Sequence, residues 1–309
     1  EYWIATSTFE WLPGIQLHRS RDLAHWQLAG HALTRPSQID LAGIAPSKGV
    51  WAPALSRDEA SGVFYLCYSL VRNITDNFFD LDNFLVTAPS MEGPWSDPVW
   101  LNASGFDPSL FHDTDGRKWL VNLEWDFRQG YEHPGALVIQ EYSPAEGRLV
   151  GQPRQVYRGG SGMGCLEGPH LFRRGDWYYL LAAEGGTGYG HGVTLARARS
   201  LAGPWEADPA NPILTAVARP FQARGNPAYL KPEHFNPGTY LQKAGHGSLV
   251  ETPAGEAFMV HLCARPARRD AAGKPVLRCV LGRETGIQRM VWTDEGWLRL
   301  DTGGCDVRP

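Results

Sequence analysis

Residues 165–186 read CLEGPHLFRRGDWYYLLAAEGG, and this stretch contains the two patterns on which the expected fold depends. An acidic residue, Glu167, stands directly ahead of a Gly-Pro pair and an apolar run that is typical of a buried strand. A polar turn at residues 174–176 then leads into an aromatic strand. A carboxyl group presented at a strand end in partly dry surroundings suits a general acid. A glutamate that caps a turn or pairs with an arginine would have only a structural role.

The polar turn followed by an aromatic strand recurs along the chain. Residues 1–5 begin inside one copy, and four further copies start at a glycine, in residues 62–66, 116–121, 175–180 and 255–260. A second pattern, a strand followed by a serine-centred turn and a tryptophan, recurs at Ser20, Ser90 and Ser200. Ser90 and Ser200 are 110 residues apart, which is about twice a unit the size of one four-stranded propeller blade.

These repeats predict an all-β fold, a five-bladed β-propeller with an active site in its central channel. We expect residues 1–309 to form a single propeller catalytic domain whose first blade is incomplete at the N-terminus. The alternative is a sandwich or an unclosed sheet in which the Gly-aromatic turns recur by coincidence. Two proline-punctuated or arginine-rich stretches, residues 215–245 and 266–278, are predicted to be surface loops.

The composition narrows the function classes. The chain has 35 glycines, 23 prolines and 12 tryptophans, which favours short strands, tight turns and flat rings for a sugar-like ligand. A net charge of -4 gives no reason to bind nucleic acid or an anionic membrane, and no apolar run approaches the roughly 20 residues that span a bilayer. The five scattered cysteines favour neither a disulfide framework nor a zinc site, so we expect a reducing, cytoplasmic location.

In a propeller the innermost strands surround one axis, so one polar or aromatic residue per blade could meet there. Trp51, Asp107, Glu167 and His246 each stand in a segment with glycine or proline, just ahead of an apolar strand. Singly, Asp107 suits an Asx-turn, His246 a core imidazole and Trp51 plain packing. Together they are the parts of a glycoside-cleaving pocket, whereas a non-catalytic sugar-binding propeller would need the rings without the carboxylates.

Long motifs over nearly the whole chain resemble those of glycoside hydrolase family 43, in its beta-1,4-xylosidase branch. They are residues 5–11, 49–53, 105–113, 167–171, 183–187, 245–252 and 281–285. The resemblance implies a five-bladed propeller of inverting enzymes. In such an enzyme one carboxylic acid protonates the departing oxygen, a second carboxylate activates water, and a third tunes the acid.

The matched positions assign roles to individual residues. Glu167 matches the general acid and Asp107 the tuning carboxylate. Phe9, Trp51 and Arg283 resemble pocket residues around a terminal xylose, and His246 resembles the central imidazole. In some relatives that histidine helps to hold a divalent cation such as calcium, but no ligand spacing in this sequence requires a metal, so no cofactor is expected.

The sequence departs from the family pattern in two places. The family's catalytic base stands in a Pro-Asp-Pro turn ahead of the position that matches Glu1, and the branch usually has a C-terminal β-sandwich beyond the position of Pro309. The resemblance therefore implies an exo-acting xylosidase that releases xylose from xylooligosaccharides or arabinoxylan fragments, but only weak hydrolysis by residues 1–309. The alternatives are an alpha-L-arabinofuranosidase and a non-catalytic sugar-binding propeller, and the oligomeric state stays open.

Overall fold

The computed structural model describes residues 1–74, 79–126, 128, 135–218, 232–273, 276 and 278–308. In these ranges the regular secondary structure consists of β-strands, with no α-helix and one short 3-10 turn, η1 (Pro232–His234). The chain divides into two compact units. The first contains β1 to β9 and most of β10 and β11, and the second contains β12 to β20.

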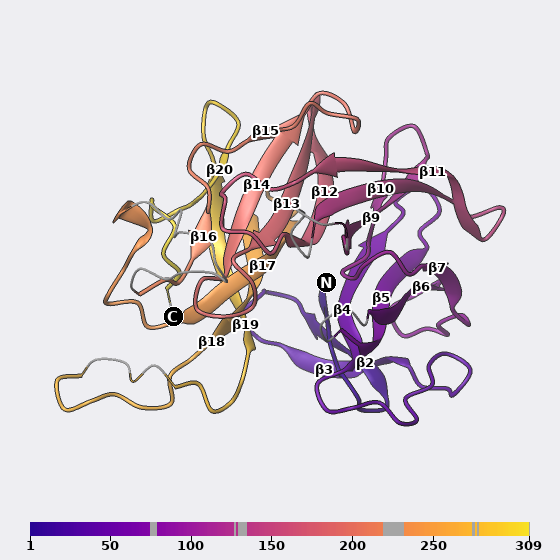
Figure 1. Ribbon diagram of the computed structural model, residues 1–309, viewed down its shortest axis with the longest axis horizontal. Coiled ribbons are helices and arrows are strands. Elements are labelled where there is room, and N and C mark those ends of the chain that lie inside the picture. Colours follow the sequence, from indigo (N-terminus) through magenta and orange to yellow (C-terminus); the bar gives the residue numbers. More distant parts are fainter. Residues whose placement is uncertain are drawn as a thin grey trace. The chain divides into compact units, whose positions relative to one another are not determined.

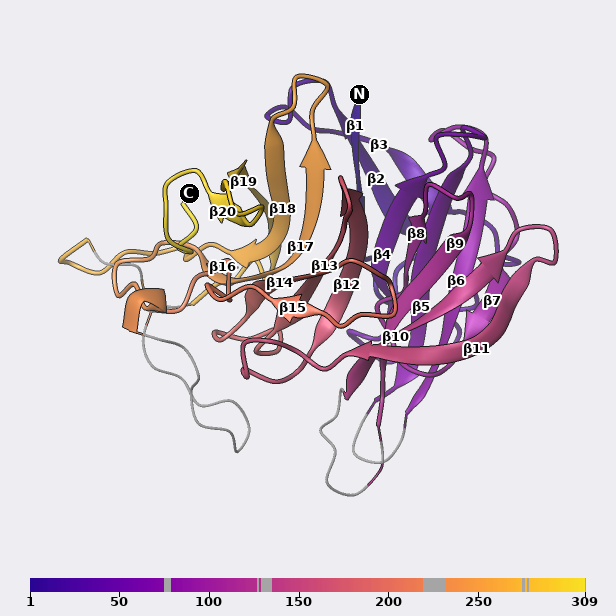
Figure 2. The same cartoon turned by 90° about the horizontal axis from the view of Figure 1, so that it is seen from above.

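The first unit contains three sheets, each built from strands consecutive in the sequence (Figure 2). The first has the order β1 (Tyr2–Thr6), β2 (Gly14–Ser20), β3 (Gln27–Leu33). The second has the order β4 (Gly49–Arg57), β5 (Phe64–Asn73), β6 (Asp80–Ala88), β7 (Val99–Asn102). The third consists of β8 (Ser109–His112), β9 (Lys118–Glu124), β10 (Ala136–Ser143) and β11 (Arg148–Tyr157).

The second unit contains two sheets of the same kind (Figure 1). One has the order β12 (Glu167–Arg174), β13 (Trp177–Glu184), β14 (Gly192–Ala198), β15 (Glu206–Ala207), and β16 (Leu214–Thr215) also pairs with β14. The other has the order β17 (Gln242–Glu251), β18 (Ala257–Ala264), β19 (Glu284–Trp292), β20 (Leu298–Leu300).

Four of the five predicted aromatic strands occupy the same place in their sheets, whereas the copy in residues 1–5 is β1, the first strand of its sheet. The four are β5, β9, β13 and β18, and each is the second strand of its sheet, next to the strand that begins it. These strands are buried along most of their length, as in β5, where seven consecutive residues from Tyr65 to Val71 are buried. In β5, burial on both faces explains why the strand is a nearly continuous run of apolar and aromatic residues rather than an alternating one.

The serine-centred turns also recur at one place, directly after a strand. Ser20 ends β2, Ser90 follows β6 and Ser200 follows β14. The carbonyl oxygens of Ser90 and Ser200 each accept a hydrogen bond from the backbone N–H of the glycine three residues on. Ser143, which the sequence pattern did not single out, ends β10 and accepts a bond from the N–H of Gly147 in a related turn.

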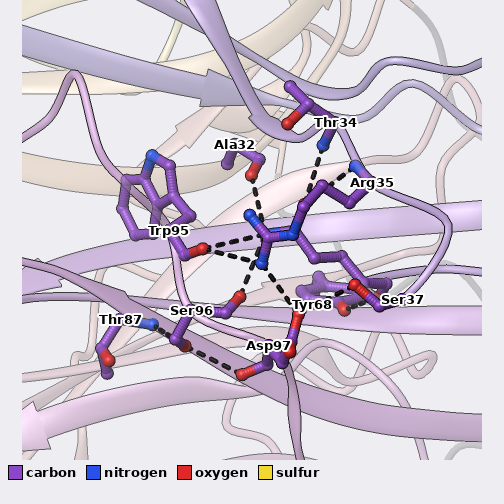
Figure 3. A network of polar contacts seen from close by, with 10 residues as sticks. Ala32, Thr34, Arg35, Ser37, Tyr68, Thr87, Trp95, Ser96 and Asp97 are labelled. Atoms are coloured by element: carbon purple, nitrogen blue, oxygen red, sulfur yellow. Dashed lines mark hydrogen bonds and ion pairs between the residues drawn. The ribbon is translucent and has the colours of Figure 1, made fainter.

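A buried glutamine holds the connection between β3 and β4 against the turn after β6 (Figure 3). Gln38 is 2% exposed. Its side-chain oxygen accepts hydrogen bonds from the backbone N–H groups of Thr34, at 2.9 Å, and Arg35, at 3.1 Å. Its amide nitrogen donates to the carbonyl oxygens of Trp95, at 3.2 Å, and Ser96, at 3.0 Å. One side chain thus bonds four backbone groups, of which the Trp95 carbonyl oxygen also accepts from the Arg35 guanidinium at 3.1 Å.

The predicted loop over residues 215–245 is wrong at both ends. Leu214 and Thr215 form β16, and β17 already begins at Gln242. Residues 219–231 of this stretch lie outside the described residues. The loop over residues 266–278 contains no strand in its described part. Short strands such as β16 leave no periodic signal, because two residues are too few to show alternation.

All five cysteines are free, and three of them, Cys67, Cys263 and Cys305, are buried. Burial raises the pKa of the Cys263 thiol to about 11, so this group is a poor nucleophile at neutral pH. Among the described residues, no helix has the length and apolar character that crossing a bilayer would require.

Candidate active site

A left-handed backbone residue recurs near the start of the first strand in four sheets. The four are Ala52, Asp107, Gly168 and His246, with φ angles of 44°, 56°, 56° and 53°. In β4, β12 and β17 the strand register shifts at this residue. Left-handed φ is uncommon for residues other than glycine and concentrates at functional sites.

This recurrence corrects the predicted correspondence of the four segments. Asp107 and His246 occupy the left-handed position itself, whereas Trp51 and Glu167 stand one residue before it. In addition, Trp51 and His246 lie inside strands β4 and β17 rather than ahead of them. The four segments do correspond, but Trp51 and Glu167 align one residue earlier than Asp107 and His246. A register shift leaves no mark in the spacing of apolar residues.

In the first unit, Phe9 is held against β4 by the backbone. Phe9 and Val50 form an antiparallel bridge, with hydrogen bonds between their N–H and C=O groups of 3.1 and 2.9 Å. Gly49 has φ of +90°, and a Cβ there would lie 2.2 Å from the carbonyl oxygen of Phe9. Only glycine permits this close approach. The predicted pocket residue Phe9 is therefore bridged to β4, the strand that contains Trp51, through residues 49–50.

Aromatic rings from three places in the chain gather beside Trp51. Its indole meets the ring of Phe106 edge-on at 5.7 Å, and its N–H donates to the carbonyl oxygen of Ser47 at 3.0 Å. Phe79 stacks on Trp125 at 4.7 Å, and both rings lie near Phe106, at 6.3 and 6.0 Å. Such a wall of rings can cover the apolar face of a sugar.

Asp107 follows Phe106 directly and is 6% exposed. Two contacts hold the turn in front of it. The backbone N–H of Leu123 in β9 donates to the carbonyl oxygen of Phe106 at 3.2 Å, and the side chain of Asn83 donates to that of Gly105 at 2.5 Å. The turn that leads into Asp107 is thus fixed to β6 and β9 in the first unit.

In the second unit, Glu167 is the first residue of β12 and pairs with Ala183 of β13. The predicted placement at a strand end is confirmed, and the side chain is 7% exposed. The next residue, Gly168, lies against the ring of His246, because a Cβ at Gly168 would come within 2.9 Å of that ring. Glu167 and His246, 79 residues apart in the printed sequence, are therefore neighbours in this unit.

His246 stands among further imidazoles and one cation. Burial, together with the positive charge of Arg283, lowers its pKa to about 4. His170 lies 6.3 Å from His246 between ring centroids, and burial lowers the His170 pKa to about 3. Burial also lowers the pKa of His191, again to about 3. These rings are neutral at physiological pH and can exchange hydrogen bonds with a neutral hydroxyl-bearing ligand.

The described residues do not form a metal site around His246. No group of three or more His, Cys, Asp or Glu side chains among them could hold a metal ion. The charged neighbour of His246 is the guanidinium of Arg283, which would repel a cation. Calcium takes six to eight oxygen ligands, so the residues described here do not fit the divalent cation considered from the sequence.

The six predicted site residues fall into two groups. Phe9, Trp51 and Asp107 come together in the first unit, and Glu167, His246 and Arg283 in the second. Sequence reasoning missed the rings and imidazoles around them, namely Phe79, Phe106, Trp125, His170 and His191. A signal was present for Trp125, which directly follows β9 beside two acidic residues.

A family model described as "Glycosyl hydrolases family 43" matches residues 1–298. The chain belongs to this family. Its family 43 relatives include a "Xylosidase/arabinosidase 43B" of Humicola insolens, 47% identical over 98% of this chain and 52% of its own length. A "Beta-xylosidase" of Bacillus subtilis (strain 168) is 46% identical over 96% of this chain and 52% of its own length.

The family 43 fold is also shown by a solved structure. The crystal structure of xylan beta-1,4-xylosidase from Bacillus halodurans C-125 matches with a TM-score of 0.88 and 50% identity, over 99% of this chain and 54% of that one. Together with five sheets of consecutive strands in the described residues, this match confirms the predicted all-β, five-bladed β-propeller. The chain spans about half the length of these relatives.

Proposed function

We propose that the protein containing this chain is an exo-acting beta-1,4-xylosidase, which releases xylose from the non-reducing ends of xylooligosaccharides with inversion. The observation that carries the proposal is the 50% identity, over 99% of the chain, to a xylan beta-1,4-xylosidase. Two buried carboxyls at the matching motif positions, Asp107 and Glu167, support it.

Glu167 is the proposed general acid, which protonates the leaving oxygen as the glycosidic bond breaks. Its carboxyl lies at a strand start, 7% exposed, where little water competes for the proton. Asp107 is proposed to tune and orient this acid. A second carboxylate activates water on the opposite sugar face, and in an inverting enzyme it lies roughly 6.5 to 9.5 Å from the acid.

The family resemblance assigns substrate contacts to four residues. Phe9 and Trp51 cover the apolar face of the terminal xylose, and the neutral imidazole of His246 and the guanidinium of Arg283 bind its hydroxyls. A ring with a pKa of about 4 stays neutral at working pH, so it can donate one hydrogen bond and accept another. The substrate would thus be a neutral glycan derived from xylan or arabinoxylan.

A second activity on arabinosides is favoured by one finding. The Humicola insolens relative has the name xylosidase/arabinosidase, and a terminal arabinofuranose presents hydroxyls similar to those of xylose. We therefore propose alpha-L-arabinofuranosidase activity as the alternative within the same site. A sugar-binding propeller without catalysis is the alternative outside the enzyme class.

The test compares the full-length protein with its Glu167→Gln variant on xylobiose and on the nitrophenyl glycosides of β-xylose and α-L-arabinofuranose. Removal of a general acid should lower kcat on xylobiose by about 10²- to 10⁴-fold. Glu146→Gln, at an exposed carboxyl paired with Arg148, is the matched control and should leave kcat unchanged. NMR of the first product formed should show the α-anomer of xylose.

Three results would contradict the proposal. Full activity of Glu167→Gln on xylobiose would show that Glu167 is not the general acid. Faster cleavage of the arabinoside than of the xyloside would favour the alternative activity. Sugar binding with no cleavage by any form of the protein would favour the non-catalytic propeller.

We also propose a cytoplasmic location, supported by five free cysteines. Fractionation of the source cells with an antibody to the protein tests this, and recovery from the medium would contradict it.

A further inference from the structure

A glycine-rich loop lies directly ahead of β12. Between the end of β11 at Tyr157 and the start of β12 at Glu167, residues 159–164 read GGSGMG, with four glycines among six residues. Glycine loses more conformational freedom on folding than any other residue. This loop therefore needs specific contacts to hold Glu167 in one place.

Those contacts converge on the carboxylate of Glu184, which is 1% exposed at the end of β13. It accepts hydrogen bonds from the backbone N–H of Gly160 at 3.1 Å and from that of Ser161 at 3.4 Å. It also accepts bonds from the hydroxyl of Ser161 at 2.5 Å and from that of Thr194 at 3.0 Å. Hydrogen bonds to an ionised acceptor are about twice as strong as neutral ones.

The residues beside Glu184 hold the rest of the same segment. Ala183 pairs with Glu167 across β13 and β12. The backbone N–H of Gly185 donates to the carbonyl oxygen of Gly164 at 2.7 Å. Three consecutive residues thus bind the start of the loop, its end and the strand that it leads into.

The loop fits closely against its surroundings. A Cβ at Gly160 would lie 2.2 Å from the hydroxyl oxygen of Tyr157 and 2.5 Å from the Cβ of Ala207. At Gly159, which has φ of +97°, a Cβ would lie 3.3 Å from Oε2 of Glu184. A side chain at Gly160 would therefore displace the loop or its neighbours, so this position requires glycine.

We propose that Glu184 is a positioning residue, which fixes the loop of residues 159–164 and thereby the direction of the Glu167 carboxyl. This inference rests on the proposed function of Glu167 as general acid. Glu184 itself is buried, and four protein donors occupy its carboxylate. It therefore acts through Glu167 and not on the substrate.

The test variant is Glu184→Gln, made in the full-length protein. Its side chain keeps the shape but puts an NH₂ group where backbone N–H donors now bind, so at least one contact is lost. The matched control is Tyr179→Phe, which removes a buried hydrogen bond to the carbonyl oxygen of Gly296 from the same strand, β13. It makes no contact with the loop through that hydroxyl.

The kinetic readout is the dependence on the leaving group. Xylobiose needs a proton on its departing oxygen, whereas a dinitrophenol leaves readily without one. A misplaced acid should lower kcat of Glu184→Gln on xylobiose by about 10²-fold, the scale of a 1 Å misplacement, with little change in KM. On dinitrophenyl β-xyloside kcat should change little, and Tyr179→Phe should keep the unaltered ratio of the two rates.

A second readout needs no activity. Amide hydrogen exchange at Gly160, Ser161 and Gly185 should be faster in Glu184→Gln than in the unaltered protein and in Tyr179→Phe. Equal losses of kcat on the two substrates, or unchanged exchange at these amides, would overturn the inference. If the unaltered protein cleaved neither glycoside, the proposed function would fail. The exchange measurement would still test the anchoring by Glu184. Unchanged exchange in Glu184→Gln would overturn it, and faster exchange would support it.

Discussion

The imidazole of His246 lies against the backbone of Gly168, so that a Cβ at Gly168 would come within 2.9 Å of Cε1 and Nδ1 of the ring. Gly168 also has φ of +56° and directly follows Glu167. One glycine thus sets the distance between the strand start that presents Glu167 and the imidazole on β17.

Replacement of Gly168 by alanine tests this contact. Gly175→Ala is the matched control, because Gly175 has φ of +57° but nothing within 4 Å of a built Cβ. Both variants bear the left-handed strain, about 1 to 2 kcal/mol, and only Gly168→Ala adds overpacking, about 1 to 3 kcal/mol. Urea unfolding should show the larger loss for Gly168→Ala. Equal losses would mean that the ring moves aside without cost.

Gly49→Ala should disrupt the bridge between Phe9 and β4. A Cβ at Gly49 would lie 2.2 Å from the carbonyl oxygen of Phe9, against rigid backbone, whereas one at Gly116, with φ of +87°, meets nothing within 4 Å. We expect Gly49→Ala to be less stable than Gly116→Ala by about 2 kcal/mol and to bind xylose more weakly in titration calorimetry. Unchanged xylose affinity would argue against Phe9 as a pocket residue.

The buried imidazoles predict a loss of stability in mild acid. Burial lowers the pKa of His170 and His191 to about 3 and that of His246 to about 4, from an ordinary value of 6.5. Between pH 6.5 and 4 the unfolded chain binds protons that the folded chain does not, so the free energy of unfolding falls as pH falls. Each histidine contributes a slope of up to about 1.4 kcal/mol per pH unit, and full stability is present above pH 6.5.

His170→Gln should remove the contribution of one histidine, up to about 1.4 kcal/mol per pH unit, from the slope of the unfolding free energy against pH. Denaturant unfolding at several pH values between 6.5 and 4.5 measures it, with His25→Gln, at a side chain 90% exposed, as the control. An unchanged slope in His170→Gln would show that this ring is already protonated in the folded protein.

Gln38→Met should destabilise the first unit. The thioether has similar length but leaves the N–H groups of Thr34 and Arg35 and the carbonyl oxygen of Ser96 without their side-chain partner. The carbonyl oxygen of Trp95 keeps only its bond from the Arg35 guanidinium. We expect a loss of about 3 kcal/mol in the free energy of unfolding, since unsatisfied buried groups cost about 1 to 3 kcal/mol each and water can reach some of them. Gln27→Met, at an exposed residue of β3, should change stability by less than about 0.5 kcal/mol. A small loss in Gln38→Met would indicate that water replaces the amide.

The blades could be predicted because their signal is local. A glycine turn followed by an aromatic run, as at residues 175–180, encodes a turn and a strand within a few residues, and β5, β9, β13 and β18 all appeared where it occurs. The positions of Asp107 and Glu167 beside glycine and proline were equally local. Both residues proved to be buried at or next to a strand start.

The side chains around Asp107 and Glu167 come from segments distant in the sequence, and the sequence pattern did not predict them. Phe79 directly precedes β6 and Trp125 directly follows β9, while His170 and His246 lie in β12 and β17. Only tertiary packing puts the rings of each pair within 4.7 and 6.3 Å. The sequence pattern also did not show where the register of β4, β12 and β17 shifts, because register depends on the partner strand. Trp51 and Glu167 therefore stand one residue before the left-handed position, whereas Asp107 and His246 occupy it.

By itself, then, the sequence determined which segments become strands and turns, and its motifs determined the family, since both are properties of short runs of residues. The tertiary structure alone decided which side chains are neighbours. The Glu184 carboxylate became the anchor of a glycine-rich loop, and His246 a neutral ring beside Gly168, only because strands distant in the chain exclude water and bring their donors, acceptors and charges together.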